Sequence, residues 1–376
     1  MVFNRWPTFY LRDLTMGASI KVIEDSKAMR KWSQEKKFEK KANAERPRVP
    51  YQAPRKQLLS ARKTVGPPRY RTSQGARKSI ASPPPRPRLK KHAVAFVPTM
   101  GSLHEGHLAL VEEAHKHADC VVVSIYVNPS QFAPNEDFSV YPRSFESDLK
   151  KLENYDVDAV FLPRNLYKGN LAVQKGEGEN EQDHQSWITL EELEKPLCGI
   201  TRPHFFRGVA TVVTKLFHIV DPDVAVFGRK DFQQLRVIET MVQELDFPVS
   251  IVSIPIVREN DGLAMSSRNK LLSEGDRAAA RVISESLGEV EKLVKGGVCI
   301  ADILKDMVKH LITGAGGRVD YVEIVDANNL KPVSNVSNLE CLVAVAVFFG
   351  KVRLIDNIIL NPKKRTHEKS SSSSST

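Results

Sequence analysis

The 376-residue chain is poor in cysteine and has no apolar segment long enough to cross a bilayer. Its four cysteines lie far apart and form no C-x-x-C pair, at Cys120, Cys198, Cys299 and Cys341. This distribution argues against a zinc ribbon and a disulfide framework. The longest strongly apolar run, Leu342 to Phe349, is too short for a membrane span, and the N-terminus lacks the apolar run of a secretory signal. We therefore expect a cytoplasmic protein without membrane contact.

Acidic residues are missing from one long stretch. Residues 46–91 contain 14 Lys and Arg and no Asp or Glu, although the whole chain has a net charge of +10. The remainder has 41 basic and 45 acidic residues, so it is mildly acidic. The basic character therefore belongs to one segment, which weakens nucleic-acid binding as the purpose of the whole protein.

The same stretch has almost no apolar periodicity and is rich in proline, with nine prolines from Glu45 to Lys91. It includes Pro83-Pro84-Pro85, which neither a helix nor a central strand accommodates. We predict that residues 46–91 are a disordered insertion.

Outside this stretch, short apolar strands alternate with helices. We expect a strand at 20–23 and a helix from 25 or 26 to about 41, then strands at 93–97, 121–127, 159–162, 224–227 and 249–257. Helices are predicted at about 106–117, 145–155, 209–220 and 232–245. The continuous apolar strands are typical of a sheet covered on both faces, and the alternation predicts an α/β fold with a doubly wound parallel sheet.

The order of predicted helices and strands changes after residue 268. Two helices, at about 274–294 and 300–312, precede strands at 319–325, 342–348 and 352–360, which predicts a smaller α+β domain. The predicted organisation is an extension at 1–19, a first strand and helix at 20–45, the insertion at 46–91, a main domain at 92–268, a C-terminal domain at 269–362 and a disordered tail at 363–376.

The first chemistry-bearing motif is Pro98-Thr99-Met100-Gly101-Ser102-Leu103-His104-Glu105-Gly106-His107, between a strand and a helix. His104 and His107 share a face at the helix N-terminus, and the glycines let backbone approach a ligand. A helix N-terminus with two imidazoles suits a polyphosphate. The alternatives are a zinc pair, for which no third ligand is evident, and ordinary surface histidines.

Two further motifs follow later strands. In Phe227-Gly228-Arg229-Lys230-Asp231, Lys230 suits phosphate oxygens and Asp231 suits a ligand or a helix cap. In Asp261-Gly262-Leu263-Ala264-Met265-Ser266-Ser267-Arg268, two hydroxyls and a guanidinium can donate to phosphate. The structural alternatives are a cap with a solvated lysine, and a capping box that opens the last domain.

Two polar segments complete the set. Asn128 and Gln131 follow the strand at 121–127 and can bond a small substrate, and Arg202-Pro203-His204-Phe205-Phe206-Arg207-Gly208 precedes a helix. An arginine there can clamp an anion, although a surface ion pair is an equally good interpretation of the spacing.

In this order, the five segments resemble the pantoate–β-alanine ligases (pantothenate synthetases) in their plant-like form, over about residues 20–362. The resemblance implies a Rossmann-like domain of the nucleotidyltransferase superfamily, a C-terminal lid domain and a homodimer. It implies that ATP and Mg²⁺ are used to join pantoate to β-alanine through a pantoyl adenylate, with release of AMP and pyrophosphate.

The resemblance also implies roles for individual residues. The catalytic residues would be His107, His104, Lys230 and Arg268. Pantoate would bind Gln131 and Gln234, with Asn128 assisting and Gln131 also near β-alanine. Asp148 would lie near magnesium, although Ser147 replaces an acid found in some members. ATP would bind Met100, Gly101, Ser102, Leu103, His104, Glu105, Gly106, His107, Gly228, Arg229, Lys230, Asp231, Val257, Met265, Ser266, Ser267 and Arg268.

Two departures stand out. The common bacterial pattern Arg-Pro-Gly-His-Phe is Arg202-Pro203-His204-Phe205-Phe206 here, so the usual histidine position is Phe205 and His204 receives no role. Residues 46–91 separate a helix and a strand that the family joins almost directly, so they are either an insertion or translated intron sequence.

Two other functions are kept as alternatives. Another nucleotidyltransferase with the His-x-Gly-His motif would transfer a nucleotide without β-alanine. An RNA-binding protein would use the basic stretch, but only Tyr51 and Tyr70 supply aromatic rings for stacking there. We therefore expect no nucleic-acid partner.

Overall fold

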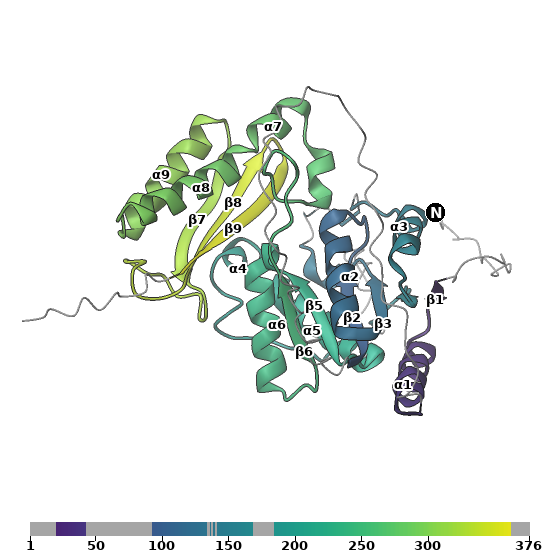
Figure 1. Ribbon diagram of the computed structural model, residues 1–376. Helices are drawn as coiled ribbons and strands as arrows, with labels where there is room; N and C mark the ends of the chain where they lie inside the picture. The colour runs from purple at the N-terminus through teal and green to yellow at the C-terminus, as the bar shows by residue number, and fades with distance from the viewer. Residues whose placement is uncertain are drawn as a thin grey trace, which may run out of the picture.

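The computed structural model describes residues 20–42, 92–133, 136, 138–139, 141–167 and 184–361. The predicted extension at 1–19, insertion at 46–91 and tail at 363–376 lie outside the described residues. The described residues form two β-sheets, one parallel and one antiparallel (Figure 1).

The first sheet is parallel and has the strand order β1-β4-β3-β2-β5-β6. The chain builds β2, β3 and β4 toward one edge and then crosses to the other side of β2 for β5 and β6. This reversal of direction is where open α/β sheets present a ligand crevice, beyond the carboxyl ends of the strands. The strands are β1 (Lys21–Ile23), β2 (His92–Thr99), β3 (Ala118–Ile125), β4 (Ala159–Phe161), β5 (Val224–Gly228) and β6 (Ser250–Ile254).

Side chains of the central strands alternate between two cores. In β2, Val94 and Phe96 belong to one apolar cluster, and Ala95 and Val97 belong to another on the opposite face. Successive side chains of a strand point to opposite faces, so all four residues from Val94 to Val97 are buried. This explains the continuous apolar run in the sequence.

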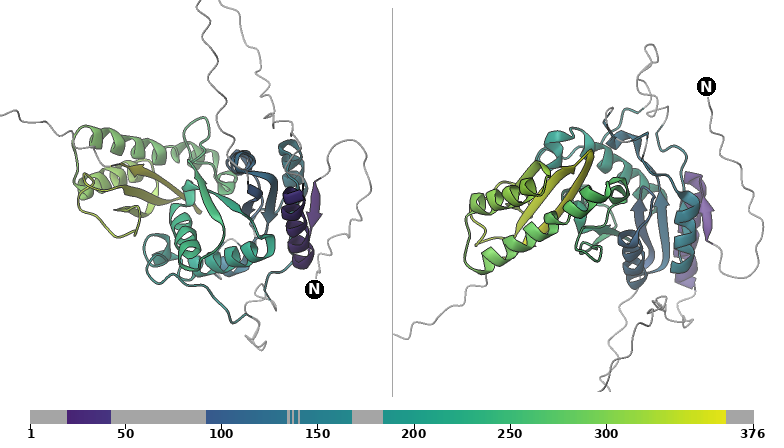
Figure 2. Two further views of the ribbon diagram at one scale, coloured as in Figure 1. Left: turned by 60° about the horizontal axis from the view of Figure 1, so that its bottom comes forward. Right: turned by 90° about the horizontal axis from the view of Figure 1, so that it is seen from above.

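Helices cover both faces of this sheet (Figures 1 and 2). Apolar residues of α1 (Ser26–Ala42), α5 (Phe205–Val220) and α6 (Phe232–Glu244) pack in the first cluster, and those of α2 (Glu105–His117) and α3 (Phe145–Leu152) pack in the second. The result is the α/β fold with a doubly wound parallel sheet that the sequence predicts.

The second sheet is antiparallel, with the order β7-β8-β9. Its strands are β7 (Arg318–Asp326), β8 (Cys341–Phe349) and β9 (Val352–Leu360), and α8 (Val282–Lys295) and α9 (Ala301–Gly314) pack on one face. The other face contributes Leu342, Ala344, Ile355 and Ile359 to the first cluster of the parallel sheet. We call residues 274–361 the C-terminal domain; it therefore packs directly against the parallel-sheet domain (Figure 2).

Several element boundaries differ from the prediction. β6 ends at Ile254 rather than residue 257. The helix expected at 274–294 is two helices, α7 (Glu274–Ala279) and α8, and α5 begins at Phe205 rather than 209. A short α4 (Cys198–Thr201) is also present. No helix among the described ranges is both long and apolar enough to cross a membrane.

Candidate active site

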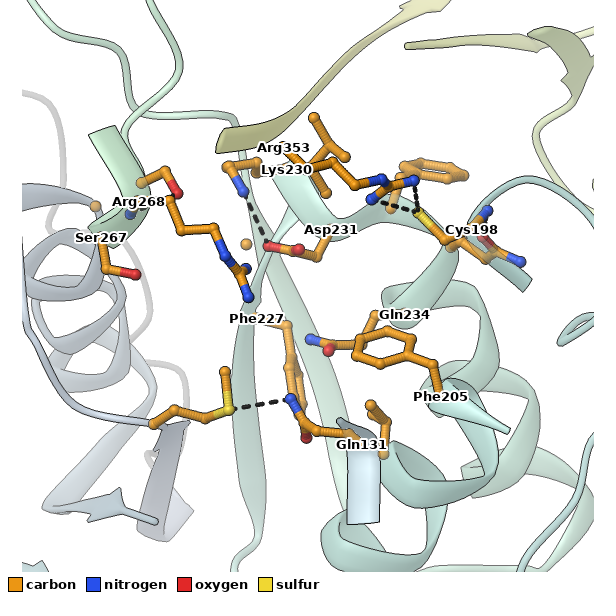
Figure 3. Close-up of a pocket in the computed structure, with 18 of the residues that line it drawn as sticks. Gln131, Cys198, Phe205, Phe227, Lys230, Asp231, Gln234, Ser267, Arg268 and Arg353 are labelled. Carbon is orange, nitrogen blue, oxygen red and sulfur yellow. Dashed lines mark hydrogen bonds and ion pairs between the residues drawn. The ribbon is translucent and has the colours of Figure 1, made fainter. Parts of the chain in front are cut away.

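A cavity of about 960 Å³ lies between the carboxyl ends of the parallel strands and the C-terminal domain. Its volume is at the upper end of the usual range for ligand sites. Figure 3 shows Arg268 and Ser267 on one side of it, and Gln131 and Gln234 on the other. The predicted site residues that line it are Met100, His104, Gly106, His107, Asn128, Gln131, Gly228, Lys230, Asp231, Gln234, Val257, Met265, Ser266, Ser267 and Arg268.

His104 and His107 form the N-terminal cap of α2. Nδ1 of His104 accepts the N–H of Gly106 at 3.1 Å, and the N–H of His104 points to Nδ1 of His107 at 3.3 Å. The two rings lie 4.1 Å apart between centroids. A Cβ on Gly106 would come within 2.9 Å of the His104 ring, so glycine is needed for this cap.

Both histidines are neutral at pH 7. Burial, followed by the charge of Lys230, lowers the pKa of His104 from 6.5 to about 4. Burial, followed by His104 and Lys230, lowers the pKa of His107 well below 6.5. Because each Nδ1 accepts a backbone N–H, the remaining proton of each ring is on Nε2. The pair therefore offers two neutral Nε2–H donors.

Asp148, for which the resemblance implies a place near magnesium, supports the loop before α2. Its side chain is fully buried, and its two oxygens accept the N–H groups of Ser102 at 2.7 Å and Leu103 at 2.8 Å. Gly101 has φ +84°, and a Cβ there would meet Asp148 Oδ2 at 3.2 Å and a methyl of Ile125 at 3.0 Å. Gly101, Ser102 and Leu103 are thus buried behind the cavity wall.

Two more of the predicted ATP contacts point elsewhere. Glu105 is exposed at the start of α2, and Nε of Arg229 donates to the hydroxyl of Ser253 at 3.0 Å. Neither lines the cavity in the described part of the chain.

Lys230 lies in η3 (Arg229–Asp231), immediately after β5. Its Nζ is 3.7 Å from Asp231, and the side chain is 20% exposed at the cavity (Figure 3). Because β5 and β2 are neighbours in the sheet, Lys230 faces the same space as the histidines, which explains its effect on their pKa values.

The segment from Met265 to Arg268 enters the cavity from the other side of β5. It follows a tight turn in which the N–H of Met265 bonds to the carbonyl of Val257 at 3.0 Å. Ser266 accepts the N–H of Arg268, and the Arg268 guanidinium lies 5.8 Å from the ring centre of Tyr141. Arg268 reaches into the middle of the cavity (Figure 3).

The predicted substrate amides differ in their surroundings. Gln131 lines the cavity, and its Nε2 contacts Sδ of Met100 at 3.0 Å. Asn128 is 1% exposed, donates to Gln131 and to the carbonyl of Gly208, and accepts from Ser130 and Tyr167. Its described contacts are those of a residue that holds Gln131. Gln234 points into the cavity from α6 (Figure 3).

The two arginines of the segment at 202–208 contact protein groups. The guanidinium of Arg202 forms two bonds to Glu136, at 2.6 and 2.7 Å, and Arg207 stacks on Trp187 at 4.6 Å. For Arg202 the ion-pair interpretation therefore holds. His204 has φ +68° at the N-cap of α5.

The C-terminal domain supplies a wall that sequence reasoning missed. Arg353 of β9 bonds to Asp320 of β7 and contacts Sγ of Cys198 at 3.6 and 3.7 Å, and the Tyr321 hydroxyl is 3.3 Å from the same sulfur. Burial and the neighbouring thiol raise the pKa of Tyr321. In the sequence, this wall was indicated by polar residues within the otherwise apolar strand Val352–Leu360.

The carboxylates that line the cavity are mostly paired with arginine. Glu136 bonds to Arg202, Asp320 to Arg353 and Asp356 to Arg258. Within the described residues, no group of three or more His, Cys, Asp or Glu side chains is arranged to hold a metal ion. With both its oxygens on backbone N–H groups, Asp148 does not fit a metal ligand.

Comparisons with known proteins agree on one family. The family profile described as pantoate-beta-alanine ligase matches residues 71–359. A curated relative from Lotus japonicus, named pantoate--beta-alanine ligase, is 50% identical over 283 residues, which are 71% of this chain and 92% of the relative.

Solved structures show the same similarity. Pantothenate synthetase from Thermus thermophilus is 41% identical with a TM-score of 0.64, covering 73% of this chain and 95% of that one. Pantoate-beta-alanine ligase from Francisella tularensis, complexed with beta-gamma ATP and beta-alanine, is 31% identical with a TM-score of 0.54, covering 72% and 91%.

Proposed function

The chain belongs to the pantoate–β-alanine ligase family, and we propose on this premise that it joins pantoate to β-alanine at the expense of ATP. The observation that carries the proposal is the convergence of three segments, after β2, β5 and β6, on one cavity. They bring neutral donors, a lysine and an arginine to one side of a space that has amide groups on the other.

In the first step, the pantoate carboxylate attacks the α-phosphorus of ATP in line. The bond from that phosphorus to the bridging oxygen breaks, and pyrophosphate leaves with the electron pair, so pantoyl adenylate remains. The carboxylate is already a nucleophile, and this step therefore needs alignment and charge stabilisation more than proton transfer.

Lys230 and Arg268 are the cations proposed for the growing phosphate charge. The Nε2–H groups of His104 and His107 add neutral donors, which their lowered pKa values support. Asp148 is proposed as a positioning residue, because its two bonds fix the backbone that leads into His104.

In the second step, the uncharged amine of β-alanine attacks the acyl carbon of the adenylate. The tetrahedral centre collapses, AMP leaves with the electron pair, and the amine loses a proton to give the amide of pantothenate. Exclusion of water from the site would protect the reactive acyl group. Gln131 and Gln234 are proposed to hold pantoate, with Asn128 fixing Gln131.

Mg²⁺ is proposed as part of the ATP complex. Mg²⁺ in nucleotide sites commonly keeps waters and takes phosphate oxygens with one or two carboxylates. Its role would be to neutralise phosphate charge. The paired carboxylates around the cavity support binding through the nucleotide rather than through a protein cage.

The test is AMP release by the purified chain with ATP, pantoate and β-alanine, each omitted in turn. We expect steady AMP release that requires all three compounds. Steady release without any added amine would contradict the ligase and favour hydrolysis, and nucleotide transfer without β-alanine would favour another nucleotidyltransferase.

A homodimer is also proposed from the family resemblance, and a cytoplasmic location is proposed from the scattered cysteines, which suit a reducing compartment. Sedimentation velocity of the purified chain tests the dimer, for which a single monomeric species across the micromolar range would be contrary evidence. Microscopy of the tagged full chain tests the location.

A further inference from the structure

Two adjacent residues of β9 contact two different segments that carry proposed phosphate-binding side chains, namely η3 and the turn that leads to Met265. The side-chain amide of Asn357 donates to the carbonyls of Arg229 at 3.1 Å and Lys230 at 2.8 Å. The carboxylate of Asp356 accepts hydrogen bonds from the two terminal guanidinium nitrogens of Arg258, Nη1 at 2.6 Å and Nη2 at 3.0 Å. Both side chains are buried, with exposures of 5% and 2%.

The alternation of the strand separates these two contacts. Successive side chains point to opposite faces of a sheet, so Asn357 lies on the face shared with Ile355 and Ile359, which pack toward the parallel sheet. The side chain of Asp356 points to the opposite face of the sheet and bonds to Arg258. Arg258 also donates to the carbonyl of Gly262 at 3.0 Å. Arg258 thus closes the turn that leads to Met265.

Each contact ends at a segment with a proposed phosphate ligand. Asn357 fixes the backbone that carries Lys230, and Asp356 fixes the base of the turn before Ser266 and Arg268. An amide that spans two consecutive carbonyls limits both displacement and rotation of η3. Side chains that must lie within a few tenths of an ångström of a reacting phosphate depend on such support.

We propose that Asp356 and Asn357 are positioning residues through which the C-terminal domain sets the places of Lys230 and of the Met265–Arg268 segment. The proposal rests on the proposed function of the cavity and adds a supporting role for the domain that covers it.

The test is Asn357→Asp, which keeps the shape of the side chain and removes both donors. The matched control is Asn335→Asp on the same domain, because Asn335 uses its oxygen, as an acceptor from the Ser337 N–H, and aspartate retains it. The readout is the rate of the pyrophosphate burst with ATP and pantoate. We expect a loss of at least tenfold for Asn357→Asp and none for the control.

A double-mutant cycle separates positioning from loss of fold. If Asn357 acts through Lys230, Asn357→Asp adds little loss in a Lys230→Ala background, because the group that it positions is already gone. Equal fold losses in both backgrounds, or a normal burst in Asn357→Asp, would overturn the proposal. Should the aspartate variant fail to fold by circular dichroism, Asn357→Ser, which keeps one donor, runs the same cycle.

The proposed function and this inference fail differently. If the wild-type chain gives no burst at all, the ligase is contradicted, and the cycle is then measured on ATP affinity by calorimetry. Weaker ATP binding of Asn357→Asp that disappears in the Lys230→Ala background would still support the positioning role, and unchanged ATP binding would overturn it.

Discussion

The loop after β2 and the segments after β5 and β6 face the same cavity, but different parts of the chain hold them. The β2 loop is supported within its own domain, by the buried Asp148 carboxylate and the paired histidine cap. The other two segments bond to Asn357 and Asp356 of the C-terminal domain. The first wall of the site is therefore held within the parallel-sheet domain, whereas the second wall is held by contacts from the C-terminal domain.

Removing a proposed phosphate-binding side chain from either wall should lower turnover more than any other change. We expect His107→Ala on the first wall and Lys230→Ala on the second each to lower turnover by roughly 10²–10³, as loss of a group that stabilises transition-state charge typically does. The measurement is steady-state AMP release. His115→Ala, at the other end of α2, is the control, because His115 bonds to the carbonyl of Tyr155. Near-normal turnover in either variant would remove that residue from the mechanism.

Weakening the internal support should cost less. Asp148→Asn places an amide against two N–H donors, and a buried unsatisfied group costs about 1–3 kcal/mol of stability. We expect a burst roughly tenfold slower or more, because the loop shifts. Added Mg²⁺ should not restore it, whereas rescue by Mg²⁺ would indicate a metal ligand.

Asp223→Asn is the control for that variant. Asp223 accepts two consecutive N–H groups, from Ala93 and Val94, at the amino ends of the strands, opposite the cavity. We expect it to lower the melting temperature and leave the burst rate unchanged. Equal rate losses in both variants would mean that general destabilisation explains Asp148→Asn.

His104, which is neutral in the first wall, should make the free energy of unfolding depend on pH. Unfolded His104 binds a proton below about pH 6.5, whereas the folded chain resists it until about pH 4. The free energy of unfolding should therefore fall as the pH drops from 6.5 to 4, and this fall should be smaller in His104→Gln. Denaturant titrations at several pH values measure it, and an identical slope in both proteins would contradict the low pKa.

The basic stretch should matter least to either wall. We predict that deletion of residues 46–91, leaving a short turn, retains ligase activity and solubility, because the stretch has no apolar face and loop closure depends weakly on length. Trypsin should cut it early in the intact protein. Loss of activity on deletion, or resistance to trypsin, would show that it is a structured part of the enzyme.

The two walls also differ in how far the sequence predicts them. The loop with His104 and His107 is local: a strand, glycines and a helix cap within ten residues. The order of the apolar strands likewise predicts the doubly wound sheet, because burial on both faces leaves a continuous apolar run.

The contacts of Asn357 and Asp148 could not be predicted from local sequence patterns. The partner of Asn357 lies 127 residues away in the chain, and that of Asp148 lies 46 residues away. Local pattern does not encode these pairings, which arise from the packing of the C-terminal domain and from the place of α3. The family resemblance implied that Asp148 lies near magnesium, and its two bonds to the backbone before α2 could not be seen from the sequence.

The most direct test of two separate supports is the pyrophosphate burst of Asp148→Asn, Asn357→Asp and the double variant, measured with ATP and pantoate in the absence of β-alanine. Supports that act independently predict that the fold loss of the double variant equals the product of the two single losses. A double variant no slower than the slower single variant would contradict the account, because both residues would then act through one shared arrangement.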